Sequence, residues 1–123
     1  MTKATFSNGF TDTYKGHRDV KAAWAIILKS TGETLNSGHS LDAQKADKTA
    51  RNNLRYTKTD CGIVTPFLSI PGKTVSHIEY VLKEARAQGY TGKAHGLRAF
   101  VMAHNAKVTD AILREVRIEV INL

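Results

Sequence analysis

An apolar run near the N-terminus constrains the fold more than any other feature of this sequence. Every residue from Ala22 to Leu28 is hydrophobic. Alternate side chains of a strand point to opposite faces of the sheet, so this run is apolar on both faces. Such a strand is covered on both sides, and we predict a central strand beginning near Asp19. The 123-residue chain is long enough to bury a core around it as one compact domain, residues 1–123.

Turn signals on either side of this run predict further strands. Asn8-Gly9 separates two short strand-like segments, 4–7 and 10–14, and this dipeptide favours a hairpin with a two-residue type I′ turn. A strand at 34–39 follows the run, with Gly38 as a candidate bulge. The first forty residues are therefore predicted to form a β-meander.

Two helices are predicted from hydrophobic spacing and capping signals. Ser40 is placed to cap a helix over 41–55, which carries a buried stripe of alanines and Leu54. Ser76 and Glu79 have the spacing of a capping box for a second helix that ends at Gly89. Val75 and Tyr80 flank that box as a hydrophobic staple.

The rest of the chain is less uniform. The segment 62–67 is a short strand or irregular, 97–104 is helix or strand, and the alternation in 115–121 predicts a half-exposed strand. The expected fold is α+β: an antiparallel sheet with two or three helices packed on one face.

Net charge and cysteine content restrict the partners and the compartment that we expect. Eighteen Lys and Arg against 11 Asp and Glu give a net charge of +7, which favours anionic partners. Cys61 is the single cysteine and suits a reducing cytoplasm. We see no apolar run long enough for a membrane span and no signal peptide, so a cytoplasmic protein without a membrane partner is expected.

Metal and nucleophile chemistry are not expected. The histidines lack metal-ligand spacing, and we expect them on surface loops and at helix ends: His17, His39, His77, His95 and His104. Cys61 follows Asp60, an unfavourable neighbour for a thiolate. We therefore assign no catalytic residue, no metal and no cofactor.

Two groups of residues have the chemistry of anion binding. The first combines cations, rings and an amide suited to a nucleotide, with arginine on phosphate and a ring on the base; its members are Tyr14, Lys15, Arg18, Arg98, Phe100, Asn105, Arg114 and Arg117. The second suits phosphate groups or nucleic acid and comprises a helical ridge and the end of a phosphate-loop-like Gly-Lys-Thr sequence; its members are Lys45, Lys48, Arg51, Arg55, Lys73 and Thr74.

Within the expected order, three consecutive strands followed by a helix and a strand resemble the ribonuclease H-like fold. Nucleases of that fold need three or four acidic residues that converge on two magnesium ions. Asp42, Asp47, Asp60 and Asp110 are present, but none stands in such a motif. A nucleic-acid-binding protein of this fold, using the basic ridge, remains an alternative.

The segment from Phe6 to Gly16, followed by Arg18 and the run 22–26, resembles the Thoeris anti-defence sponge proteins of phages. That resemblance implies a small α+β homo-oligomer. It also implies capture, without cleavage, of the cyclic ADP-ribose signals that bacterial TIR-domain enzymes make; some members also bind cyclic oligonucleotides. Our leading hypothesis is thus a phage immune-evasion protein that sequesters such a signal. The third hypothesis is an inhibitor of a host defence enzyme by direct contact.

Overall fold

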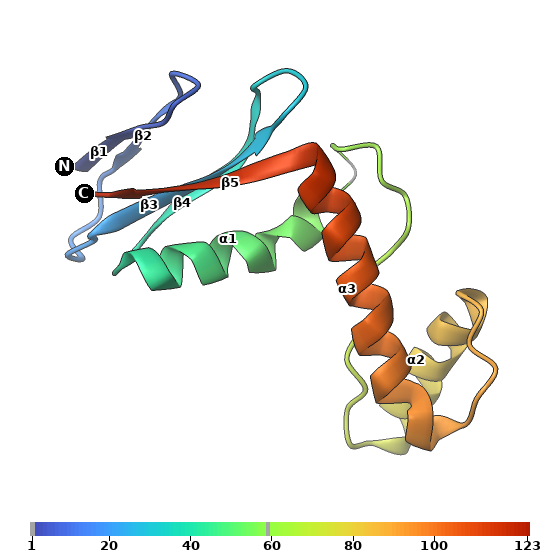
Figure 1. The fold of residues 1–123 in the computed structure, drawn as a ribbon. Coiled ribbons are helices and arrows are strands. Elements are labelled where there is room, and N and C mark those ends of the chain that lie inside the picture. The colour runs from blue at the N-terminus through green and yellow to red at the C-terminus, as the bar shows by residue number, and fades with distance from the viewer. Residues whose placement is uncertain (1, 59) are drawn as a thin grey trace. The chain divides into compact units, whose positions relative to one another are not determined.

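The computed structural model describes residues 2–58 and 60–123. Its secondary-structure elements, in chain order, are β1 (Thr2–Thr5), β2 (Thr11–Tyr14), β3 (Ala22–Leu28), β4 (Thr34–Ser40), α1 (Ala43–Thr57), α2 (Val75–Ala87), the 3-10 helix η1 (Ala94–Gly96), α3 (Leu97–Glu115) and β5 (Val116–Asn122) (Figure 1). The predicted α+β class with antiparallel sheets is confirmed.

The chain groups into two compact units. The first contains Met1–Val64 and Ala111–Leu123, and the second contains Thr65–Asp110. Helix α3 crosses the division, so its residues 97–110 belong to the second unit. Cooperative behaviour of residues 1–123 as one domain stays a prediction, which a single unfolding transition would support.

The first unit is built around β3, as the apolar run predicts. Strand β3 lies between β4 and β5 in an antiparallel sheet, and six of its seven residues are buried. On one face Ala23, Ala25 and Ile27 pack against Phe6 of the β1–β2 hairpin. Helix α1 packs on the sheet as well, and the alternate side chains, such as Trp24, point to this other face. The strand is therefore covered on both sides.

The predicted continuous meander is wrong. Strands β1 and β2 form a separate two-stranded sheet, and β5 from the end of the chain occupies the position beside β3. The physical reason is the apolar second face of β3. The hairpin folds over that face and buries it, which a flat continuation of the sheet would not do.

The β1–β2 hairpin is confirmed, but its turn is not type I′. Thr5 pairs with Thr11, and the amide of Phe6 donates to the carbonyl of Phe10, which leaves three residues in the loop. Gly9 has φ +88°, and every described residue with a positive φ is a glycine. The amide of Gly9 donates to the Phe6 carbonyl at 2.9 Å. This pattern fits a type I turn with a glycine bulge.

Gly38 is not a bulge. The register between β3 and β4 shifts at Ile26 and Ile27 instead. Gly38 pairs with Trp24, and a Cβ at position 38 would lie 2.8 Å from atoms of the Trp24 indole. Glycine is needed here because the indole lies across the strand at this position.

Helix α1 forms where expected, with a different cap. Ser40 ends β4, and Asp42 is the cap: its side chain accepts a hydrogen bond from the Lys45 amide at 2.8 Å. The helix buries Ala46, Ala50 and Leu54, so the predicted small-residue stripe is confirmed. Its alanines allow α1 to lie close to the sheet.

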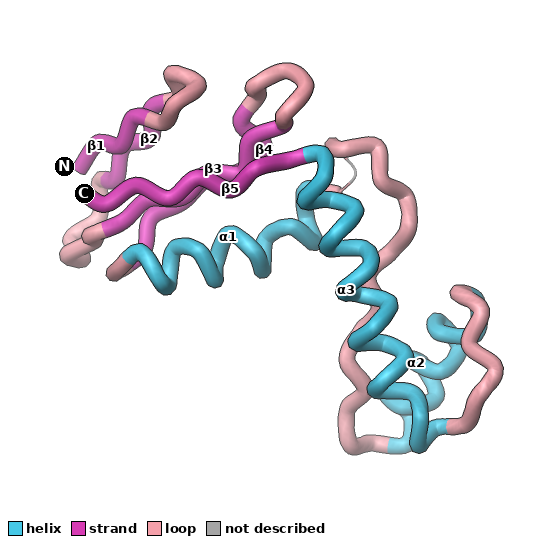
Figure 2. Tube along the Cα trace, viewed as in Figure 1, coloured by secondary structure: helices cyan, strands magenta, loops and turns pink. Residues whose placement is uncertain are grey.

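The second unit consists of helices and loops (Figure 2). Helix α2 is confirmed, but its cap is Thr74, which accepts from the His77 amide, and not Ser76. Val75 and Tyr80 are 72% and 56% exposed, so the predicted staple is wrong. The Gly89 end is confirmed: Gly89 and Tyr90 donate to carbonyls of the last turn, as in a Schellman motif.

The remaining segments are now defined. Residues 97–104 are helical and open α3, while 62–67 form no helix or strand. Helix α2 packs on α3 through Val81, Ala85, Leu97 and Val101. The helix that packs on the three-stranded sheet is α1, whereas α2 packs within the second unit. No helix in residues 2–58 and 60–123 is long and apolar enough to cross a membrane.

Candidate functional site

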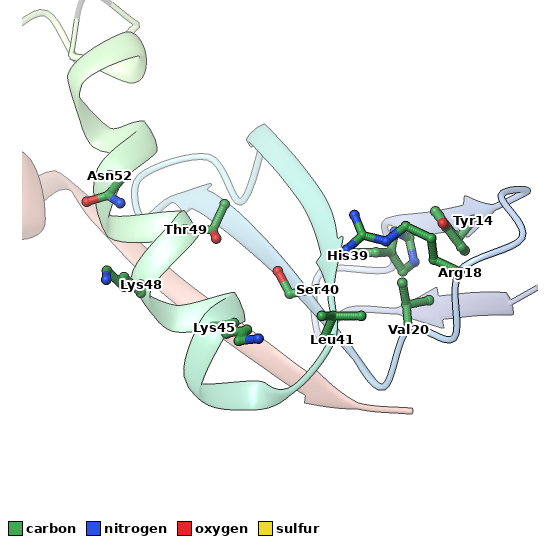
Figure 3. A pocket seen from close by; sticks show the side chains of 10 residues that line it. All are labelled: Tyr14, Arg18, Val20, His39, Ser40, Leu41, Lys45, Lys48, Thr49 and Asn52. Carbon is green, nitrogen blue, oxygen red and sulfur yellow. The ribbon is translucent and has the colours of Figure 1, made fainter.

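A cleft of 480 Å³ lies in the first unit, beside the carboxyl ends of β2 and β4 and the first turns of α1. Tyr14 ends β2 and Arg18 follows in the loop to β3. Helix α1 contributes Lys45 and Lys48 to the lining, and the Lys48 amine points away from the strand ends (Figure 3). The volume is within the range of small-molecule sites, about 300–1,000 Å³.

Positive charge dominates this cleft. Arg18, Lys45 and Lys48 are all exposed, and no carboxylate stands among the described residues that line it. The carboxylate of Asp12 lies 3.5 Å from the lining residue His39, and the cap residue Asp42 is engaged with the Lys45 amide. Three cations, one from the loop after β2 and two from α1, therefore line one opening, and such a concentration of positive charge attracts a phosphorylated ligand.

An aromatic pair forms one side of the cleft. The rings of Tyr14 and His39 are 5.4 Å apart at an interplanar angle of 37°. Gly16 allows this placement, because a Cβ there would collide with the Tyr14 ring. Tyr14 is half-buried, so part of its ring is open to a base or another flat group. Stacking on such a ring contributes about 1–3 kcal/mol per base.

His39 is the least expected member of the site. Its side chain is 7% exposed, and its Nδ1 lies 3.5 Å from Oδ2 of Asp12. Its Nε2 is buried without a hydrogen-bond partner among the described residues. Buried polar atoms are rarely left unpaired, so a ligand polar group that reached this nitrogen would satisfy it.

Neutral polar groups complete the cleft. Ser40 contributes a hydroxyl from the end of β4, and Thr49 and Asn52 contribute a hydroxyl and an amide from α1 (Figure 3). Hydroxyl and amide groups of this kind donate to and accept from sugar hydroxyls. The cleft thus combines cations, a ring and neutral hydrogen-bonding groups.

A second depression of 540 Å³ lies along the outer side of α1. It shares Lys45 and Lys48 with the cleft and adds Arg51. Two aspartates also line it, and Asp47 pairs with Arg51 at 3.0 Å. The ridge predicted from the sequence is therefore real, but its charge is partly neutralised on this side.

The structure brings together members of both predicted groups. Tyr14 and Arg18 of the first group line the cleft with Lys45 and Lys48 of the second. Lys15 is exposed in the same loop but does not line the cleft. Arg51 lines only the outer depression, and Arg55 lies further along α1 and is exposed.

Three predicted residues lie elsewhere, on the part of α3 that belongs to the second unit. Asn105 bonds both backbone groups of Leu68, at 2.7 and 2.9 Å, and so fixes that loop. The Phe100 ring lies between those of Tyr90 and His104, at 4.8 and 6.1 Å. Arg98 is exposed. Asn105 and Phe100 thus have structural roles. None of the three lines the cleft, so the sequence-based prediction that they contact a ligand is the alternative to binding at the cleft.

The remaining predicted residues are also dispersed. Arg114 is exposed near the end of α3. Arg117 donates to Ser7 Oγ at 2.8 Å and lies 3.8 Å from Glu119 on β5. Thr74 caps α2 and Lys73 precedes it, exposed. None of these four lines the cleft or the outer depression.

Cys61 lies in the first unit, outside the cleft. Burial raises the pKa of its thiol, and the nearby Asp60 and Glu115 carboxylates raise that pKa further. The thiolate, which is the nucleophilic form, is therefore disfavoured. This supports the interpretation of an inert thiol.

Sequence reasoning missed His39, Ser40, Thr49 and Asn52. It placed the histidines on loops and at helix ends, whereas His39 lies in β4 and His104 lies inside α3. The sequence does contain a signal for His39 and Ser40. They directly precede the short turn into α1, so the end of β4 and the basic ridge at the start of α1 are expected to be neighbours. Among residues 2–58 and 60–123, no group of three potential metal ligands occurs.

Comparisons with protein-family models, with curated proteins and with solved structures give no match. The function is therefore argued from the cleft and from the chemistry of the residues around it.

Proposed function

We propose that this protein binds a small phosphorylated nucleotide-type ligand in the cleft and holds it without cleaving it. The observation that carries the proposal is that Arg18, Lys45 and Lys48 line one cleft beside the Tyr14–His39 ring pair. Arginine engages phosphate through a fork of N–H donors, and lysine adds compact positive charge. The ring pair offers a face for a base.

The resemblance to the anti-Thoeris sponges makes a cyclic ADP-ribose-type signal the first ligand to test. Such a molecule carries two phosphates, two riboses and an adenine. The cleft offers cations for the phosphates and a ring for the adenine. The Ser40, Thr49 and Asn52 side chains can bind the ribose hydroxyls. On this proposal the protein acts in the host cytoplasm for a phage and removes a defence signal by capture.

Calorimetry with purified cyclic ADP-ribose isomers and with cyclic oligonucleotides tests the proposal. Stoichiometric binding is expected, with the ligand recovered intact after the protein is denatured. Arg18→Ala and Lys48→Ala should each weaken binding by about 1.5–3 kcal/mol, the range for hydrogen bonds to charged groups. Conversion of the ligand, or no binding to any of these compounds, would contradict the proposal.

Arg98→Ala is the matched control, because Arg98 is also exposed but lies in the second unit. Its affinity should equal that of the parent. If Arg98→Ala weakens binding and Arg18→Ala does not, the cleft is the wrong site, even though the protein binds the ligand.

A second candidate function is nucleic-acid binding, favoured by the outer depression of α1. Lys45, Lys48 and Arg51 are exposed along about two turns of the helix. Binding to duplex DNA by this face should fall steeply with salt, because each phosphate contact releases counterions. Anisotropy titrations of labelled DNA at two salt concentrations separate this function from capture of a small ligand. Lys45 and Lys48 contribute to both, whereas Arg51→Ala should weaken only DNA binding.

A further inference from the structure

Strand β5 has one unpaired side. In the sheet order β4-β3-β5 it lies at an edge, paired to β3 only. Within residues 2–58 and 60–123 no strand pairs with its other side. An exposed edge strand is a ready template for pairing with another chain.

The ladder with β3 determines which backbone groups face outward. At its two ends, the Lys29 amide donates to the Glu115 carbonyl at 2.8 Å and the Leu123 amide donates to the Lys21 carbonyl at 2.9 Å. In an antiparallel ladder, hydrogen-bonded and non-hydrogen-bonded pairs alternate. With the observed register, the N–H and C=O groups that point away from β3 belong to alternate residues: Val116, Ile118, Val120 and Asn122.

We propose that a second copy of this chain pairs with this edge, β5 against β5, in an antiparallel arrangement with its two-fold axis at Ile118. Ile118 then faces Ile118 of the partner and exchanges both backbone hydrogen bonds with it. Val116 faces the partner's Val120, and both also use outward-facing groups. The two three-stranded sheets become one six-stranded sheet.

Charge complementarity selects this register. Arg117 falls opposite the partner's Glu119, and Glu119 falls opposite the partner's Arg117. Both are non-hydrogen-bonded pairs, in which the Cα atoms are about 4.5 Å apart and the side chains approach most closely. Opposite charges across strands stabilise the pairing, and like charges destabilise it.

The neighbouring registers lack this complementarity. An axis at Glu119 sets Glu119 against its own copy, and an axis at Arg117 sets two arginines together. An axis at Val120 leaves Arg117 opposite Leu123. Only the axis at Ile118 pairs both charges.

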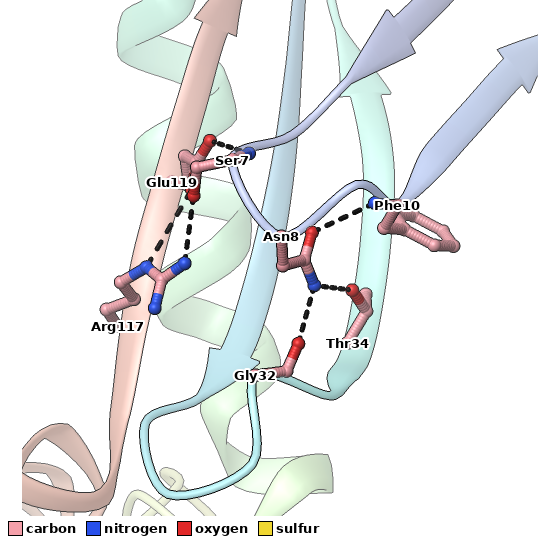
Figure 4. A network of polar contacts seen from close by, with 7 residues as sticks. All are labelled: Ser7, Asn8, Phe10, Gly32, Thr34, Arg117 and Glu119. Carbon is pink, nitrogen blue, oxygen red and sulfur yellow. Dashed lines mark hydrogen bonds and ion pairs between the residues drawn. The ribbon is translucent and has the colours of Figure 1, made fainter.

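The two charged side chains are already positioned. The Ser7 amide donates to Glu119 Oε1 at 2.8 Å, and Arg117 Nη2 donates to Ser7 Oγ at 2.8 Å (Figure 4). The Arg117 side chain is 42% exposed and that of Glu119 22%. Because Ser7 already restrains both side chains, less conformational entropy is lost when the partner arrives.

Sedimentation of charge-reversed variants tests the proposal. The parent should form dimers, and Arg117→Glu and Glu119→Arg should each dissociate at least tenfold more readily, since each sets like charges together twice. A mixture of the two variants should restore the dimer, because every cross-strand pair in the heterodimer is again of opposite charge. A monomeric parent, unaffected variants, or a mixture that stays monomeric would overturn the proposal.

Cross-linking gives a readout that does not depend on Glu119, whose substitution also removes the Ser7 contacts. In a Cys61→Ser background, Ile118→Cys places the two thiols at the axis, with Cα atoms about 5.5 Å apart. Val120 is equally half-buried. In the Val120→Cys dimer the two Cα atoms of residue 120 are four residues apart along the paired strands, a distance of about 14 Å. A short thiol-to-thiol reagent should join the first variant into dimers and not the second. Equal cross-linking of both, or of neither, would refute the register.

Discussion

Asn8 connects the β1–β2 hairpin to the main sheet, and its removal provides a quantitative test of the fold. Its Nδ2 donates to the Gly32 carbonyl at 2.7 Å and to Thr34 Oγ1 at 2.8 Å, and its Oδ1 accepts from the Phe10 amide at 3.1 Å (Figure 4). One side chain therefore makes three hydrogen bonds, two of them to the turn before β4 and to its first residue.

Asn8→Ala removes all three. A net contribution of about 0.5–1.5 kcal/mol for each bond gives a sum of about 1.5–4.5 kcal/mol, and we expect about 2 kcal/mol because these groups are exposed and water replaces part of each bond. The corresponding fall in melting temperature is about 6–10 °C for a domain of this size. Urea unfolding followed by circular dichroism measures the free energy directly.

Asn52→Ala is the matched control, because Asn52 is exposed and its side chain makes no hydrogen bond to the described residues. Its free energy of unfolding should stay within about 0.5 kcal/mol of the parent. If Asn8→Ala costs no more than Asn52→Ala, the hairpin is not held to the sheet as described. The placement of Tyr14, which ends the hairpin, would then lose its physical basis.

Three further predictions concern single residues. Gly38→Ala should destabilise the protein by about 1–3 kcal/mol and shift the Trp24 fluorescence, because the added Cβ meets the indole; an unchanged melt with unchanged fluorescence would be inconsistent with the close approach. Asp42→Ala should cost about 1 kcal/mol through loss of the α1 cap, measured by thermal unfolding, and no loss would show that the cap is dispensable. Alkylation of Cys61 should need a higher pH than alkylation of a free thiol, because the pKa of Cys61 is raised. The folded state therefore binds the thiol proton more tightly than the unfolded state. The contribution of this group to stability is present at neutral pH and is lost as the pH rises from the unfolded pKa through the raised folded pKa. Asp60→Asn should move the alkylation profile to lower pH, and a profile equal to that of a model thiol would contradict the raised pKa.

The elements could be predicted from the sequence because their signals are local. The run from Ala22 to Leu28 predicted the buried central strand, and the alanines of α1 predicted its buried stripe. Element ends were less certain because several capping residues compete within a few positions. Asp42 took the place of Ser40 and Thr74 that of Ser76.

The pairing of strands and the site depend on contacts between distant segments, which a single sequence does not encode locally. Arg98 and Arg117 belong to one stretch of sequence but lie in different units. Arg18 and Lys45 are separated by two strands yet line one cleft. The cleft appears only once β4 and its turn place α1 beside the hairpin exit.

Chemical-shift mapping by NMR during a titration with cyclic ADP-ribose tests the central claim most directly. The account predicts saturable shifts centred on Tyr14, Arg18, His39 and the first two turns of α1, with signals of residues 97–105 unchanged. Shifts confined to α3, or a spectrum that does not change at saturating ligand, would contradict it.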